Sequence, residues 1–260
     1  MDAIIEFYTQ IDIFLLVFTR VIAILVVVPV FSDKKVPPIA QAGLSFVISI
    51  IVIYSTPLME IEYNANMIGY GFLIIKEIMV GLIIGFIVYM MFQIFLLVGQ
   101  LISSSSGLSM SNMYDPTIGQ QVPIVGNLYY YVAIALFLVT NGHHIIFRSL
   151  IHSYSLIPIG QGQLTSSIVG QMVTMLNNYF IISVKIAAPV MVTIFILDFA
   201  LGILARTAPQ MNMFVIGFPI KIMAALVMML ITTVLMATAY EYVFDQIQIN
   251  LRQVIQGLRP

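Results

Sequence analysis

Long apolar runs separated by short polar connectors are the main pattern of this 260-residue chain. A helix needs roughly 20 apolar residues to cross about 30 Å of hydrocarbon. Runs that meet or approach this length cover 13–31, 39–57, 68–102, 122–140, 179–205 and 213–239. The pattern therefore predicts about six membrane helices.

Several of these helices are not expected to be straight rods. The run 68–102 would be over 50 Å long at about 1.5 Å per residue, so it must tilt, break or protrude. Pro29, Pro189 and Pro219 lie inside other runs, where proline removes a helix hydrogen bond. The shorter apolar segment 145–159 contains Arg148 and Pro158 and is interpreted as an interfacial or re-entrant helix. We predict kinked or broken helices.

Composition supports the membrane interpretation. Hydrophobic residues make up 61% of the chain and charged residues 8%, and the mean hydropathy is +1.07. A soluble globule usually has about 25% charged residues. The predicted fold class is an all-α membrane protein, with 1–260 forming a single integral membrane domain.

The same composition argues against several classes of function. Ten scattered basic residues and a net charge of -1 provide no surface for nucleic acid. There is no cysteine, and the N-terminus lacks the basic region of a signal peptide, so the first run is expected to remain in the protein. The spacing of His143, His144 and His152 does not fit a metal site, and no phosphate-binding loop is present. We therefore expect no metal, no cofactor, no catalytic residue and no enzymatic activity.

Charged residues within or beside the apolar runs are candidate assembly residues. Each would cost roughly 2.5–3.5 kcal/mol at a lipid-facing helix centre, so they should face protein or water. They are Arg20, Lys76, Glu77, Lys185, Asp198, Arg206 and Lys221. Structural ion pairs, a conduction or proton path and subunit contacts all remain open. Asp198 is expected to pair with Lys185 or Lys221, and Lys76 and Glu77 should face different neighbours.

Two further features suggest close packing and an amphipathic end. Gly81 and Gly85 lie four residues apart, a spacing that lets two membrane helices approach. In the tail 241–260, apolar residues recur at 243, 247, 251, 254 and 258, but the segment is too polar to span. This stripe is expected either to lie on the membrane surface or to dock against a neighbouring subunit.

Several motifs resemble the FliR family of the flagellar type III secretion export gate. The longest is LDFALGILARTAPQMNMFVIGFPIKI (197–222), and shorter ones are KEIMVGLIIGF, VGQLI, YDPTIGQQVP, NGHH and IPIG. The resemblance implies a multi-pass protein of the bacterial inner membrane and flagellar basal body, built of bent helical hairpins. It implies a channel formed with FliP and FliQ for unfolded flagellar proteins, with FlhB and FlhA nearby and membrane lipid around it. A secondary transporter or ion channel is the alternative, although the two related halves of a transporter are not evident.

The polar connector 103–121 is either a solvated linker or, as the resemblance implies, a plug that closes the pore. Gly107, Asp115, Pro116 and Gly119 would keep its backbone irregular. Met110, Met113 and Tyr114 could fill a narrow lumen, and Gln120 and Gln121 could bond to its backbone groups.

Overall fold

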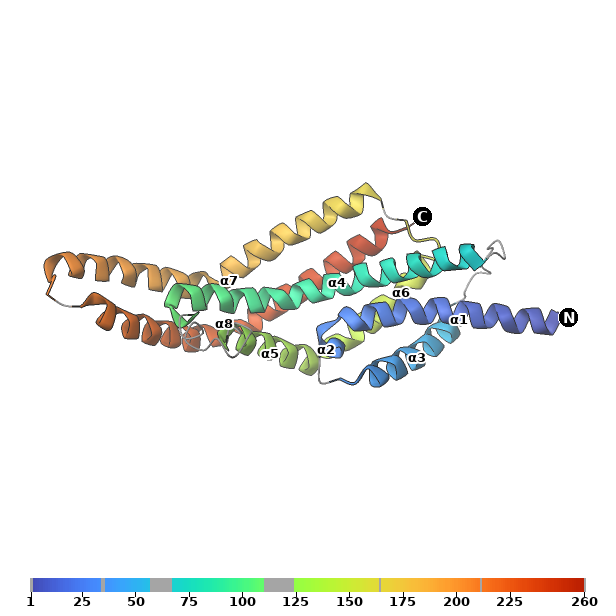
Figure 1. Ribbon diagram of the computed structural model, residues 1–260, viewed down its shortest axis with the longest axis horizontal. Coiled ribbons are helices and arrows are strands. Elements are labelled where there is room, and N and C mark those ends of the chain that lie inside the picture. The colour runs from blue at the N-terminus through green and yellow to red at the C-terminus, as the bar shows by residue number, and fades with distance from the viewer. Residues whose placement is uncertain are drawn as a thin grey trace. The chain divides into compact units, whose positions relative to one another are not determined.

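The computed structural model describes residues 2–33, 36–56, 67–109, 124–163, 165–210 and 212–259. Apart from short turns, these residues form helices, and no strand occurs among them. The helices are α1 (Asp2–Val27), α2 (Pro29–Ser32), α3 (Pro38–Ser55), α4 (Met67–Ser106), α5 (Ile124–Val139), α6 (Gly142–Leu156), α7 (Ser166–Thr207) and α8 (Met213–Gly257) (Figure 1). The all-α prediction is confirmed.

Five helices, α1, α3, α4, α7 and α8, are long and apolar enough to cross a membrane. Helices α5 and α6 pass the same test only together, and a bend of 72° separates them. Asn141, in the left-handed region at φ 57°, begins α6 at this bend. The bent pair fits a broken span or a re-entrant loop, and a re-entrant helix was one of the two arrangements predicted for 145–159. The chain is therefore a multi-pass membrane protein.

The prolines act differently from one another. Pro29 follows a break after α1 and begins α2, a position where its missing N–H costs no hydrogen bond. Pro189 and Pro219 lie inside α7 and α8, which continue past them, so neither proline ends its helix. Helix α4 also runs unbroken for 40 residues, about 60 Å. Breaks are therefore fewer than the sequence suggested.

The described chain divides into two compact units, each with its own internal contacts. The first contains Met1–Met90, Thr140–Met175 and Asp245–Pro260, and the second contains Met91–Val139 and Leu176–Phe244. Residues of α4, α7 and α8 contribute to both units, so neither is a contiguous piece of chain.

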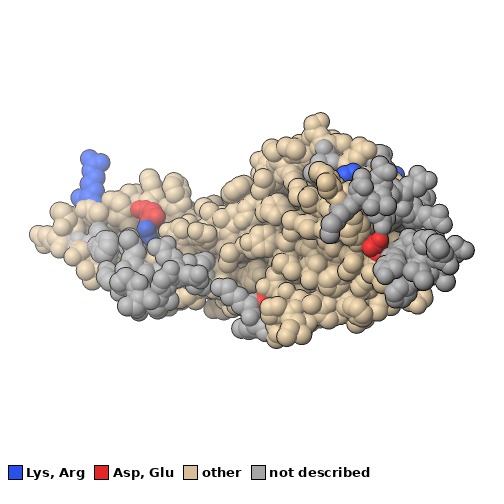
Figure 2. Space-filling model, turned by 45° about the vertical axis from the view of Figure 1, so that its right-hand side comes forward, with Lys and Arg blue, Asp and Glu red and all other residues tan. Residues whose placement is uncertain are grey.

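The core of each unit is apolar. In the first unit, the buried face of α1 includes Leu16, Val21 and Ile24. In the second unit, Phe137 packs edge-on against Phe92, with ring centroids 5.3 Å apart. On the face drawn in Figure 2, the described surface carries few charged side chains. Many large apolar residues of α7 and α8 are exposed, as expected of helices that contact lipid or other subunits.

The tail 241–260 corrects a prediction. It continues α8 as far as Gly257 instead of forming a separate surface helix. The apolar stripe is buried within the chain, at Val243, Ile247, Leu251, Val254 and Leu258. The helix end is held by hydrogen bonds from Gln163 N to Leu258 O (3.2 Å) and from Thr165 Oγ1 to Gly257 O (3.3 Å). The stripe therefore faces this chain and neither lipid nor a neighbouring subunit.

Candidate functional site

The first part of the polar connector is helical. Ser103–Ser106 complete α4, and the hydroxyls of Ser105 and Ser106 donate to the carbonyls of Leu101 (2.7 Å) and Ile102 (2.8 Å). A serine that bonds to the carbonyl four residues earlier can remain in a helix with little exposed polarity. The connector therefore begins at Gly107, four residues later than the sequence suggested.

Gly107 is required where α4 ends. Its φ is +81°, a conformation that residues with a side chain rarely adopt. A Cβ atom at this position would lie 2.8 Å from the ring of Phe218 on α8. The other predicted plug residues, Met110, Met113, Tyr114, Asp115, Pro116, Gly119, Gln120 and Gln121, lie outside the described residues.

Two glycines bring together the helices on either side of the connector. A Cβ atom added to Gly99 on α4 would lie 2.2 Å from Cα of Gly126 on α5. The two backbones are therefore in direct contact, which only a pair of glycines permits. The sequence interpretation did not single out this contact. The sequence did contain a signal for this close approach, because Gly99 and Ser103 are small residues four positions apart.

An ion pair links α7 and α8 in the second unit. Asp198 pairs with Lys221, and their side chains are 45% and 25% exposed. Of the two partners predicted for Asp198, the structure shows Lys221. The pair is only partly shielded by this chain.

Two other predicted charges are exposed on α7. Arg206 lies in the last turn, where the helix dipole favours a cation. Lys185 borders a small cavity of about 170 Å³ together with Tyr129 and Thr232. Within the described part of the chain, neither residue forms an ion pair.

The first unit contains a buried ion pair between α1 and α4. Arg20 Nε lies 2.5 Å from Glu77 Oε2, and Arg20 Nη2 donates to Glu77 Oε1 at 3.0 Å. The Arg20 side chain is fully buried and the Glu77 side chain is 1% exposed. This bidentate geometry is the strongest arrangement for a guanidinium and a carboxylate.

Residues of α6 and the turn after it complete this buried site. Arg20 Nη1 donates to the carbonyl of Ile157 at 3.1 Å, and its guanidinium lies 4.2 Å from the ring centroid of Tyr154. The N–H of Gly160 donates to Glu77 Oε1 at 2.7 Å. The ion pair therefore joins three segments that are far apart in the sequence. Sequence reasoning did not find these contacts, although IPIG, which contains Ile157 and Gly160, was among the motifs of the resemblance.

Lys76 reaches the same turn by another route. Its Nζ donates to the carbonyl of Gly160 at 3.2 Å, whereas Glu77 accepts from the N–H of that glycine. The two adjacent side chains were expected to face different neighbours. They have different polar partners, but both fix Gly160.

The predicted glycine pair lies where α4 packs against α1. A Cβ at Gly81 would lie 2.7 Å from the carbonyl oxygen of Arg20, and one at Gly85 would lie 3.1 Å from that of Ile24. The close approach at Gly81 occurs one turn from Glu77, so it holds the carboxylate near Arg20. Close helix packing and the buried ion pair therefore form one structural unit.

The described residues define a multi-pass, all-α membrane protein. No group of three His, Asp or Glu residues in the described ranges could hold a metal. The family model for bacterial export proteins, family 1, matches residues 11–247, and the chain belongs to this family.

Named relatives agree with this assignment. The flagellar biosynthetic protein FliR of Bacillus subtilis (strain 168) is 34% identical over 237 residues, which cover 89% of this chain and 88% of the relative. FliR of Escherichia coli (strain K12) is 28% identical and covers 92% and 91%. FliR of Aquifex aeolicus (strain VF5) is 25% identical and covers 84% of each chain. The resemblance found in the sequence motifs is confirmed.

Proposed function

We propose that this chain is a subunit of the flagellar type III export apparatus in the bacterial inner membrane, at the flagellar basal body. It forms, with FliP and FliQ, a channel through which unfolded flagellar proteins leave the cell, and FlhB and FlhA act beside it. The observation that carries this proposal is similarity to FliR from Bacillus subtilis along 89% of the chain. Its role is to build the passage and not to catalyse a reaction.

The surface of the second unit supports a role within an assembly. Exposed apolar residues such as Phe195, Phe199 and Val234 occur along α7 and α8, together with exposed Lys185 and Arg206. A cation on a membrane helix is costly when it faces lipid, so a polar neighbour or a wet lumen would stabilise it. Contacts with other subunits would bury the apolar side chains and provide polar partners for the two cations.

We also propose that the connector after α4 closes the channel when no substrate passes. Its polar residues lack the apolar periodicity that would hold helices together, so it is better suited to gating than to packing. At the ends of the connector, Gly107 packs against Phe218, and the Gly99–Gly126 contact holds α4 against α5.

Co-purification tests the assembly role. A tagged copy expressed from its native locus should retain FliP, FliQ and FlhB at a constant ratio after solubilisation in mild detergent, and cells lacking the gene should have no flagella. Gly99→Leu should lower the yield of the complex, because the side chain would meet the backbone of α5. Gly71→Leu is the matched control, since nothing lies within 4 Å of a Cβ at that position. A tagged chain that purifies alone, or normal flagella on cells that lack the gene, would contradict the proposal.

A further inference from the structure

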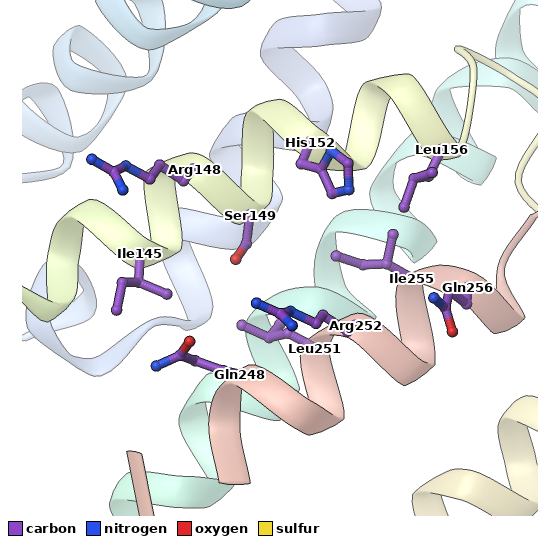
Figure 3. A pocket seen from close by; sticks show the side chains of 10 residues that line it. All are labelled: Ile145, Arg148, Ser149, His152, Leu156, Gln248, Leu251, Arg252, Ile255 and Gln256. Carbon is purple, nitrogen blue, oxygen red and sulfur yellow. The ribbon is translucent and has the colours of Figure 1, made fainter. Parts of the chain in front are cut away.

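Basic side chains border two cavities in the described part of the chain. The larger, about 610 Å³, lies in the first unit between α6 and the last turns of α8. Its arginines do not converge on one point, because Arg148 points away from Arg252 (Figure 3). The smaller, about 170 Å³, lies in the second unit between α5, α7 and α8 and borders Lys185. A single charged group is therefore better matched by the smaller cavity.

The polar lining of the smaller cavity is suited to an anion. Lys185 of α7 supplies an ammonium group, and Tyr129 of α5 and Thr232 of α8 supply hydroxyl groups that can donate hydrogen bonds. None of the eight lining residues is acidic. Within the described ranges, Lys185 takes part in no ion pair. The cavity therefore lacks the negative charge that would balance its lysine.

The position of Lys185 makes the lack of a counter-charge costly. Lys185 lies within the apolar run 179–205, and its neighbour Val184 is 47% exposed on the surface of the chain. A lysine that faces lipid at the centre of a membrane helix costs roughly 2.5–3.5 kcal/mol. On the same two helices, Lys221 has Asp198 as its partner. Lys185 therefore needs an anion from outside the described chain.

The cavity is open to the surroundings on one side and closed on the other. Lys185 is exposed, and Leu235 is 57% exposed. Tyr129 and Thr232, in contrast, are only 5% and 8% exposed. The volume is below the roughly 300 Å³ of pockets for whole small molecules, so the space suits one inserted side chain. Ile231, one turn before Leu235, is 59% exposed, so the surface beside the opening suits an apolar helix.

We propose that this cavity receives the carboxylate of an aspartate or glutamate on a membrane helix of a neighbouring subunit. The carboxylate pairs with Lys185, beside the hydroxyls of Tyr129 and Thr232, and apolar residues of the partner helix cover Leu235 and Ile231. Ionisable residues within membrane segments usually pair with one another in this way. The inference rests on the proposed role in a channel of several subunits, and it adds the chemistry of one contact.

Carbodiimide crosslinking of the purified complex tests the pairing. Dicyclohexylcarbodiimide enters the membrane, activates a carboxyl group and joins it to an adjacent amine through an amide bond, while the carbodiimide becomes a urea. Chymotryptic digestion and mass spectrometry should reveal an amide between Lys185 and an aspartate or glutamate of another subunit. The amide between Lys221 and Asp198 is the positive control, because these residues form an ion pair within this chain.

Variants separate the cation from the space that it borders. Lys185→Gln should abolish the crosslink and lower the amount of partner retained in mild detergent by about tenfold, because it leaves a carboxylate without its cation. Lys185→Arg should retain the partner. Ala239→Leu keeps Lys185 but fills the cavity, so it should also reduce the crosslink. Arg259→Gln is the matched control, because it removes an exposed cation outside the second unit.

An intact complex that crosslinks at Lys221 and not at Lys185 would overturn the inference and leave the proposed channel role in place. A crosslink from Lys185 to a carboxylate of this same chain would overturn it as well. Equal acetylation of Lys185 by a water-soluble reagent in the complex and in the isolated chain would show that the lysine faces a wet lumen instead. A chain that purifies alone would contradict the channel role itself. Wild-type unfolding temperatures identify folded variants, and Ala239→Leu provides the test if Lys185→Gln fails to fold.

Discussion

Arg20 and Glu77 form a bidentate ion pair in the interior of the first unit, although 57 residues separate them in the chain. The pair binds α1 to α4, and the N–H of Gly160 donates a third hydrogen bond to the same carboxylate. Removing one member of such a pair leaves the other charge buried without compensation.

Glu77→Gln should therefore destabilise the protein by about 3–5 kcal/mol, because it leaves the Arg20 guanidinium buried without an anion. The measurement is thermal unfolding of the purified chain in detergent. Lys76→Gln is the matched control, since Lys76 is exposed and makes one hydrogen bond to a carbonyl. Equal unfolding temperatures for the two variants would show that the pair is not a stabilising centre.

The partner of Asp198 can be tested by a double-mutant cycle. Asp198→Ala and Lys221→Ala should be coupled by about 1 kcal/mol, because the two side chains form a partly exposed ion pair. Lys185→Ala, on the same helix as Asp198, should show no coupling to Asp198→Ala. The readout is thermal unfolding of all single and double variants. Coupling to Lys185 and not to Lys221 would contradict the observed pairing.

Shortening the connector should affect permeability more than assembly. Deletion of 110–121 leaves α4, Gly107 and the Gly99–Gly126 contact in place, so the complex should still form. If the connector closes the channel, entry of sodium or small solutes should rise. A control deletion of the same length starting at Ser103 should impair assembly, because it removes the last turn of α4. Normal tightness in an assembled 110–121 deletion would exclude the plug role.

The end of α8 gives a prediction from thiol labelling, because the chain has no cysteine of its own. Ile247→Cys should be protected from both water-soluble and lipid-soluble reagents, since Ile247 is 4% exposed. Ile249→Cys should react readily, since that side chain is 46% exposed. Rapid reaction at both positions would show that this part of the helix is not packed within the chain.

The sequence predicted helices better than it predicted their partners. Among the described residues, apolar runs located the helices that are long enough to span a membrane, because a backbone in lipid must form its hydrogen bonds internally. The end of α4 at Ser106 was missed, because a serine that bonds to a helix carbonyl has the sequence pattern of a loop. The end of α8 at Gly257 was missed, because an apolar stripe buried in the same chain has the sequence pattern of a surface helix. Hydropathy along the chain does not encode which residue opposes another, so the contact between Arg20 and Glu77 could not be predicted.

The candidate residues also divide into those that the pattern of one helix predicts and those that only the contacts between helices identify. The spacing of Gly81 and Gly85 predicted a close approach, since it reports a property of one helix face. The contact between Gly99 and Gly126 depends on two helices separated by the connector, and only the three-dimensional arrangement identifies it.

The Gly99–Gly126 contact also limits how far the connector can reach. Residues 107–123 leave from α4 and return to α5, two helices whose backbones touch close to both ends. Because both ends of the connector are anchored close together, only half of its length can extend in any one direction. At about 3.4 Å per residue, its midpoint cannot lie more than about 30 Å from those ends. Any opening that the connector blocks must lie within this distance of the ends of α4 and α5.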